Sequence, residues 1–156
     1  MDRSKERNFN KSVQAWIKKY GHVTNHEDKW TPGVADISWA VQGFEGWIEL
    51  KVQPQPVDFA LKWQYLLRPY QLPWLCDRER HGGDVWVMYQ MITRGRDYRG
   101  VPTSTNSLCY VAFKPFWLKE REDKGDTLFK LLKTEEKNRF ITDDFDTMMK
   151  RLITKS

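Results

Sequence analysis

Cysteine and histidine are scarce in this chain of 156 residues, which has two cysteines and three histidines. Cys76 and Cys109 are too few for a disulfide framework or a four-cysteine zinc site, so both are expected to be small core residues of a protein in a reducing interior. His22 and His26 stand four residues apart without helical periodicity around them, which disfavours a zinc site. The sequence contains no GxxxxGK[ST] motif, which argues against a P-loop nucleotide site.

Long apolar runs are also missing. No run approaches the 18 residues of a membrane-spanning helix, and no apolar stretch of the signal-peptide kind follows the charged residues 1–7. We therefore expect a cytoplasmic protein. Hydrophobic residues nevertheless make up 40% of the chain and aromatic residues 14%, including eight tryptophans. This composition can form a sizeable core, so the length predicts a single domain over residues 1–156 and a disordered chain is excluded.

The chain is moderately basic. It has 26 Lys and Arg against 21 Asp and Glu, a net charge of +5 and a pI near 9.2. Such a charge suits a polyanionic partner such as nucleic acid. The charges are spread along the chain without a basic tail, so any basic groove has to be assembled by the fold.

Hydrophobic periodicity predicts helices and strands in the order α-β-β-α-β-β-α, which indicates an α/β fold with a sheet flanked by helices. The expected elements are a helix over 4–20, strands over 34–41 and 47–52, a helix over 69–80, strands over 85–92 and 108–113, and mostly helix beyond 115. A cap at Thr142 or Asp143 is predicted for the last helix. Residues 53–67 give no clear pattern, and 94–107 are a polar loop.

Two acidic residues and a lysine are predicted to share one face of a hairpin. A two-residue turn at 42–43 pairs Val41 with Phe44, and therefore Asp36 with Glu49. Cross-strand neighbours have Cβ atoms about 4.5–5.5 Å apart. Two carboxylates at that distance repel unless a cation such as Mg²⁺ neutralises them, and Lys51 adds a positive charge beside them. The alternative is a solvated hairpin face with an incidental ion pair.

These residues resemble the motif of the PD-(D/E)xK nuclease superfamily. The resemblance extends over roughly residues 4–92 and is nearest to VRR-type nuclease domains and to small Holliday-junction-resolvase-like endonucleases of phages. It rests on 33–36 (Gly-Val-Ala-Asp), 49–51 (Glu-Leu-Lys), 68–71 (Arg-Pro-Tyr-Gln) and 82–87 (Gly-Gly-Asp-Val-Trp-Val). It implies a central mixed β-sheet flanked by helices, with a restriction-endonuclease-like core of order αβββαβ. Ala35 replaces the usual proline, and residues 94–156 match nothing in the family.

The resemblance also implies a site. Asp36, Glu49 and the backbone carbonyl of Leu50 would bind Mg²⁺, for which Mn²⁺ can substitute. Lys51 would orient or deprotonate the attacking water, or stabilise the charge that develops on the phosphate.

Two further catalytic residues are implied on helices. Glu6 would complete the metal shell, directly or through water, or bind a second metal, and Gln71 would position Lys51 or the scissile phosphate. Each has a plainer interpretation. An acid is favoured at a helix N-terminus by the helix dipole, and a glutamine is an ordinary polar residue at a helix start.

The polar loop supplies candidate DNA contacts. Arg94, Arg96 and Arg99 lie among glycines and hydroxyl residues, which suits contacts to phosphates, although a solvated hairpin tip is equally compatible with this pattern. The tryptophans at 30, 39, 47 and 63 are interpreted as core or dimer-interface residues rather than as base-stacking platforms.

The sequence as a whole leads us to expect a metal-dependent DNA endonuclease acting on branched or Holliday-junction DNA as a homodimer, and a phage gene acting in the host cytoplasm would fit. The alternatives are a restriction-like or homing-type endonuclease with sequence preference, and a non-catalytic DNA-binding module on the same fold.

Overall fold

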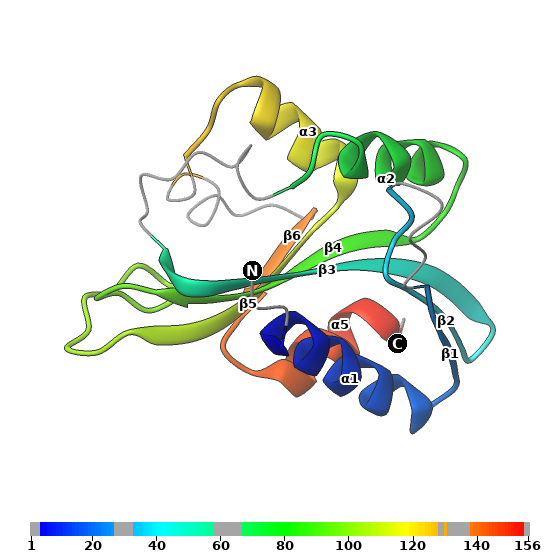
Figure 1. Cartoon of the computed structure of the whole chain (residues 1–156), viewed down its shortest axis with the longest axis horizontal. Helices are drawn as coiled ribbons and strands as arrows, with labels where there is room; N and C mark the ends of the chain where they lie inside the picture. Colours follow the sequence, from blue (N-terminus) through cyan, green and yellow to red (C-terminus); the bar gives the residue numbers. More distant parts are fainter. Residues whose placement is uncertain (1–3, 27–32, 58–66, 128–129, 131–137, 155–156) are drawn as a thin grey trace.

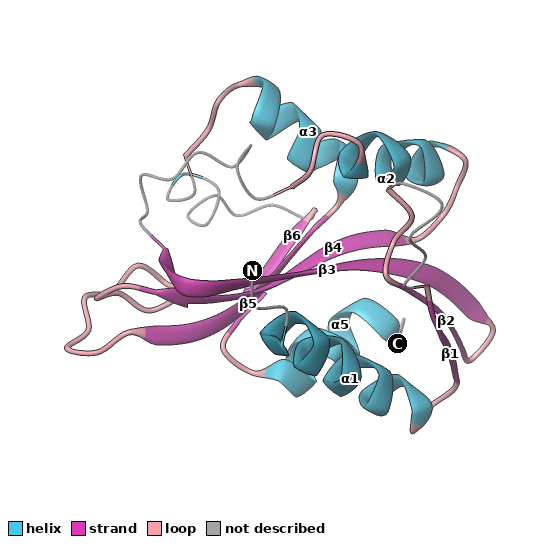
Figure 2. Cartoon of the chain, in the orientation of Figure 1, coloured by secondary structure: helices cyan, strands magenta, loops and turns pink. Residues whose placement is uncertain are grey.

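Six strands lie side by side in the order in which they occur along the chain, and helices cover both faces of the sheet they form (Figures 1 and 2). This computed structural model describes residues 4–26, 33–57, 67–127, 130 and 138–154. The helices are α1 (Ser4–Lys18), α2 (Gln71–Arg80), α3 (Pro115–Asp123) and α5 (Phe145–Ile153). The strands are β1 (His22–Asn25), β2 (Ile37–Val41), β3 (Phe44–Val57), β4 (Val85–Thr93), β5 (Ser107–Phe113) and β6 (Arg139–Thr142).

The predicted α/β class is confirmed, and the sheet is mixed. Strands β3 and β4 are parallel, and every other neighbouring pair is antiparallel. Helix α2 makes the crossover that two parallel strands require. The first six elements follow one another in the order α-β-β-β-α-β.

The hairpin of β2 and β3 has the predicted register. Val41 pairs with Phe44 and Ile37 with Ile48. The turn is closed by Gln42 and Gly43, whose φ angles are 53° and 83°. Positive φ at both central residues is the two-residue turn that matches the twist of a hairpin, and glycine adopts it without steric cost.

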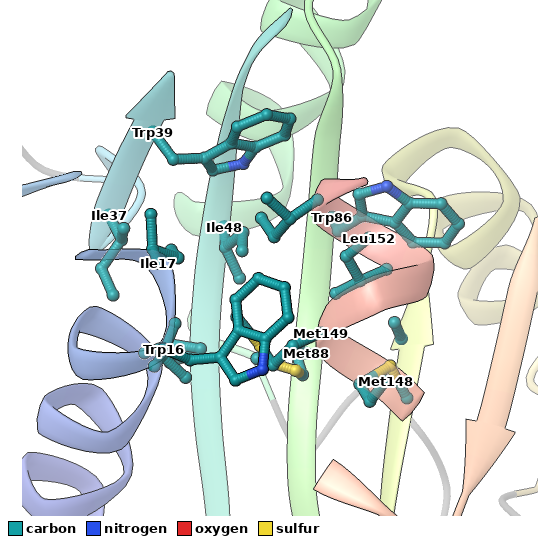
Figure 3. Close-up of a cluster of buried hydrophobic side chains, with 14 of the residues drawn as sticks. Trp16, Ile17, Ile37, Trp39, Ile48, Trp86, Met88, Met148, Met149 and Leu152 are labelled. Atoms are coloured by element: carbon teal, nitrogen blue, oxygen red, sulfur yellow. The ribbon is translucent and has the colours of Figure 1, made fainter. Parts of the chain in front are cut away.

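Each face of the sheet has its own hydrophobic core, because alternate side chains of a strand point to opposite faces. Helices α1 and α5 cover one face, where their side chains meet Ile37, Trp39 and Ile48 from the hairpin and Trp86 and Met88 from β4 (Figure 3). Helices α2 and α3 cover the other face, which carries the alternate residues of β4 and β5. The prediction that 85–92 is a strand buried on both faces is confirmed for residues 85–89, all of which are buried.

The two edge strands, β1 and β6, were not predicted from the sequence. Strand β1 has no alternating pattern and is mostly exposed, whereas β6 lies in a region that was expected to be helical. The predicted cap of the last helix is wrong as well. Thr142 belongs to β6, and the cap is Asp144, whose backbone N–H donates to Thr142 Oγ1 (3.1 Å). Of the ambiguous stretch 53–67, β3 takes residues up to 57 and residues 58–66 lie outside the described residues.

Other expectations concern membrane spans and thiols. None of the helices in the described part of the chain is both long and apolar enough to cross a membrane. Both cysteines are buried and free. Burial raises the pKa of Cys76 to about 11 and that of Cys109 to about 12, which agrees with small core residues.

Candidate active site

The predicted site lies where β2 begins and β3 continues past it. The pairing of β2 with β3 ends at Ile37 and Ile48, so Leu50 lies beyond the part of β3 that pairs with β2. Its backbone N–H donates instead to Asp36 Oδ2, at 2.9 Å. The carboxylate of Asp36 thus accepts the hydrogen bond from the Leu50 N–H, in place of the backbone carbonyl that a longer β2 would have supplied. Because the N–H and C=O of one residue leave a strand on the same side, the Leu50 carbonyl also leaves β3 toward Asp36.

The side chain of Glu49 points to the face of the sheet that α2 covers, opposite to the face that carries the side chain of Leu50. Gln71, the first residue of α2, donates from Nε2 to Glu49 Oε1 at 2.8 Å. The amide oxygen of Gln71 accepts the Arg68 N–H at 3.0 Å, and this bond orients the amide with its NH₂ group toward the carboxylate. Lys51 Nζ lies 3.5 Å from the same Oε1. The structure therefore brings Glu49, Lys51 and Gln71 together.

The electrostatics of Glu49 are unusual for a carboxyl group. Its side chain is buried, with the residue 1% exposed, and Oε2 has no hydrogen-bond partner among the described residues. Burial, and after it the charge of Asp36, raise the pKa of Glu49 to about 8, although Lys51 opposes both effects. A buried carboxylate whose oxygen lacks a partner is costly. The cost is offset when Glu49 takes up a proton or when a cation lies next to Oε2.

The donor set fits a hard divalent cation rather than zinc. In the residues described, no three or more His, Cys, Asp or Glu side chains gather into a metal-binding group. Two carboxylates and one backbone carbonyl remain available, and Mg²⁺ is commonly bound through one or two carboxylates while it keeps several waters. His22 and His26 are separately engaged, the first near Thr24 and the second at 2.7 Å from Ser38 Oγ.

No family model matches the chain, and no curated protein matches its sequence. Support for a function therefore comes from the residues and their geometry.

Glu6 is placed differently from the other predicted site residues. It lies on α1, whose buried residues Phe9 and Val13 share a core cluster with Ile48 and Leu50. That cluster is on the face opposite to Glu49. The structure thus does not bring Glu6 to Glu49 and Lys51 on their own face, and a role for Glu6 at the metal stays a prediction.

The arginine loop lies at the far end of the parallel strands. Glu49 pairs with Val87, and the loop starts after Thr93, about 20 Å farther along at about 3.3 Å per residue. Arg94, Arg96 and Arg99 are all exposed. Arg99 forms an ion pair with Asp97 at 2.9 Å, so part of the expected positive charge is already compensated. Contacts from this loop to DNA would fall well away from Glu49 and Lys51.

The predictions for tryptophan are met in part. Trp39 is buried in the core and Trp47 is half-buried, whereas residues 30 and 63 lie outside the described residues.

One neighbour of the site was not predicted. Tyr89 on β4 pairs with Lys51 in the parallel register, and its pKa is raised well above the ordinary value by burial and by the charge of Glu49. The alternation of β4 marks Tyr89 as buried, but sequence alone does not align two parallel strands.

Proposed function

We propose that this chain is a Mg²⁺-dependent DNA endonuclease that hydrolyses phosphodiester bonds, with a site of the PD-(D/E)xK kind. One observation carries the proposal: the buried carboxylate of Glu49 is held through Oε1 by Gln71 and Lys51, while Oε2 has no partner among the described residues. A purely structural carboxylate would be expected to have both oxygens satisfied. Glu49 is instead oriented and electrostatically incomplete.

The residues that would hold the cation are Asp36, Glu49 and the carbonyl of Leu50. A bound divalent cation supplies a more acidic water and shields the negative charge of the phosphate. The chain's own contribution is to hold two carboxylates next to each other in a place where they repel. Burial is the larger cause of the raised pKa of Glu49, and the charge of Asp36 adds to it.

Lys51 and Gln71 have separable roles in this proposal. Lys51 provides a cation beside Glu49 Oε1, where it can orient the attacking water or stabilise the charge that builds on the phosphate. Gln71 fixes the rotamer of Glu49 through one hydrogen bond. Gln71 is a positioning residue, because its amide contacts the carboxylate of Glu49 and acts through it.

The arrangement of the elements supports the same proposal. The α-β-β-β-α-β order of residues 4–93 is the order that the resemblance to PD-(D/E)xK nucleases implies. Residues 94–154 extend the sheet by β5 and β6 and add α3 and α5. They contribute no side chain to the hydrogen bonds of Asp36 or Glu49 described above.

The proposed substrate is branched DNA, cut by a homodimer. A four-way junction presents two like strands, so a symmetric pair of sites suits it, and this chain has one such site. This part of the proposal rests on the resemblance and on symmetry.

A metal-dependent cleavage assay tests the activity. Purified protein is incubated with linear, flapped and four-way DNA in Mg²⁺, in Mn²⁺ and in EDTA. We expect cleavage with either metal, none in EDTA, and the fastest cleavage for the four-way junction. Glu49→Gln should abolish it, because the neutral amide cannot ligate the cation in the same way.

The matched control is Glu45→Gln. Glu45 lies on the same strand and has the same alternation as Glu49, but it is exposed near the turn. Its variant should cleave like the wild type. Cleavage that survives EDTA would overturn the metal mechanism, and DNA binding without any cleavage would indicate a non-catalytic binding module instead.

A further inference from the structure

An arginine on α2 is held against two tryptophan rings near the site. The guanidinium carbon of Arg78 lies 4.7 Å from the ring centroid of Trp47 and 5.8 Å from that of Trp74. The two indoles meet edge to face, with centroids 5.4 Å apart and an interplanar angle of 70°. Both rings are half-buried, whereas Arg78 is exposed. The rings thus position a cation at the surface.

The backbone at Arg78 is fixed by the end of the helix. Gly83 N–H donates to the Arg78 carbonyl at 3.0 Å, and Gly82 N–H donates to the Glu79 carbonyl at 3.0 Å. With Gly82 at φ 89°, these two bonds form a Schellman cap. A Cβ at Gly83 would lie 3.2 Å from Arg78 Cγ, so the stem of the arginine passes close over this glycine.

The charge of Arg78 is not neutralised by a carboxylate in the described part of the chain. Two other basic residues do have a carboxylate partner: Arg80 forms an ion pair with Asp77 at 4.0 Å, and Lys114 forms one with Asp84 at 2.7 Å. A guanidinium that stacks on aromatic faces keeps its planar N–H edge available for a bidentate acceptor. Arg78 is therefore both preorganised and electrostatically incomplete.

Arg78 lies on the same face as the site and in line with it. Trp47 and Glu49 point to one face of β3, about 7 Å apart along the strand. Gln71 and Arg78 are seven residues apart on α2, which places them two turns apart on one side of the helix. Gln71 reaches Glu49 and Arg78 reaches Trp47, so helix and strand present their polar groups side by side.

We propose that Arg78 binds a DNA backbone phosphate about two nucleotides of duplex rise from the scissile one, at about 3.4 Å per nucleotide. This inference rests on the proposed nuclease function. A phosphate is the favoured ligand because its oxygens match the planar fork of an arginine and because phosphate contacts set the register of a protein on a duplex. Arg78 is then a substrate-positioning residue of the same site.

Binding measurements with Arg78→Gln test this directly, with Arg80→Gln as the matched control on the same helix. Both are made in the Glu49→Gln background, so that DNA stays uncut in Mg²⁺. We expect Arg78→Gln to weaken duplex binding about tenfold, the scale of one charged hydrogen-bonded contact. It should also lower the slope of the log association constant against log salt by about 0.9. Arg80→Gln should change neither.

Oligonucleotides with one neutral methylphosphonate each give a readout that a structural role would not change. Protein with Arg78 should lose affinity when the phosphate about two nucleotides from the cut is neutral, and Arg78→Gln should lose nothing further there. Arg78→Lys should keep the salt slope but bind more weakly than arginine, because it cannot form the bidentate contact. Melting temperatures of the variants identify any that fail to fold.

The outcomes separate the two proposals. If the wild type cleaves DNA but Arg78→Gln binds like Arg80→Gln, the Arg78 contact is refuted and the nuclease stands. If the wild type binds DNA through Arg78 without cleaving it, the nuclease is refuted and the contact stands. If the wild type does not bind DNA at all, both are refuted.

Discussion

Asp36 bonds the backbone N–H of Leu50 at 2.9 Å, and this bond joins the start of β2 to the part of β3 that lies beyond the hairpin. Leu50 is fully buried, so its N–H would otherwise lack a partner at considerable cost. The same carboxylate raises the pKa of Glu49. Asp36 therefore has a structural and an electrostatic effect on one site, and the two effects can be measured separately.

Removing the Asp36 acceptor should destabilise the fold. Asp36→Ala leaves the Leu50 N–H unsatisfied, and we expect a loss of about 1–3 kcal/mol in the free energy of unfolding. Asp36→Asn keeps an acceptor oxygen and should lose less. Urea unfolding at pH 5, where Glu49 is protonated, isolates this effect from charge repulsion. Asp77→Ala, an exposed aspartate on α2, is the control, and equal losses for both alanine variants would contradict the prediction.

The stability of the metal-free protein should depend on pH through Glu49. Its pKa is raised from an ordinary 4.5 to about 8 by burial and by Asp36, so the folded state holds a proton that the unfolded state releases. The stabilisation is complete below about pH 4.5 and is lost as the pH rises through about 8. Melting in EDTA between pH 5 and 9 should show this decline. Glu49→Gln should show a flatter curve, and parallel curves would refute the assignment.

Added Mg²⁺ should reverse that trend. A cation binds the deprotonated carboxylate, so the increase in melting temperature on adding Mg²⁺ should grow from pH 5 to pH 8 and then level off. Glu49→Gln should show almost no increase at any pH. An increase that is independent of pH in the wild type would place the cation elsewhere.

Lys51 and Gln71 should differ in their effect on the cleavage rate. Lys51→Ala should lose several orders of magnitude, as expected for a group that stabilises charge in the transition state, whereas a loss below tenfold would make it a structural residue. Gln71→Ala should lose less, because Glu49 keeps its place on β3 and loses one hydrogen bond. Single-turnover rates at saturating Mg²⁺ measure both.

Glu6→Gln should reduce turnover only through the metal, so an unchanged Mg²⁺ dependence would make Glu6 an ordinary acid of the helix N-terminus.

The arginine loop and the assembly can be tested together. Replacing Arg94, Arg96 and Arg99 by glutamine should weaken binding to linear and four-way DNA to the same extent, because phosphate contacts do not read branch geometry. Arg99 alone should matter least, since Asp97 already pairs with it.

Sedimentation is expected to give a dimer. A monomer at micromolar concentration that cuts linear and branched DNA equally would refute the junction preference and leave the nuclease proposal in place.

The sequence by itself determined the hairpin. Alternation of apolar residues and the turn at Gln42 and Gly43 are local features, and they fix which face carries Glu49 and Lys51. The glycines after α2 and the apolar run of β4 are local signals as well, and both were interpreted correctly. The class of the fold follows from such patterns because each is written in a few neighbouring residues.

The tertiary structure decided what surrounds the hairpin. The parallel pairing of β3 and β4 places Tyr89 beside Lys51, and the packing of α2 brings the amide of Gln71 to Glu49 and the guanidinium of Arg78 to Trp47. Strands β1 and β6 are short edges stabilised by their neighbours, so their own residues carry little signal. These relationships join residues far apart in the chain, and they arise only when the two faces of the sheet are packed.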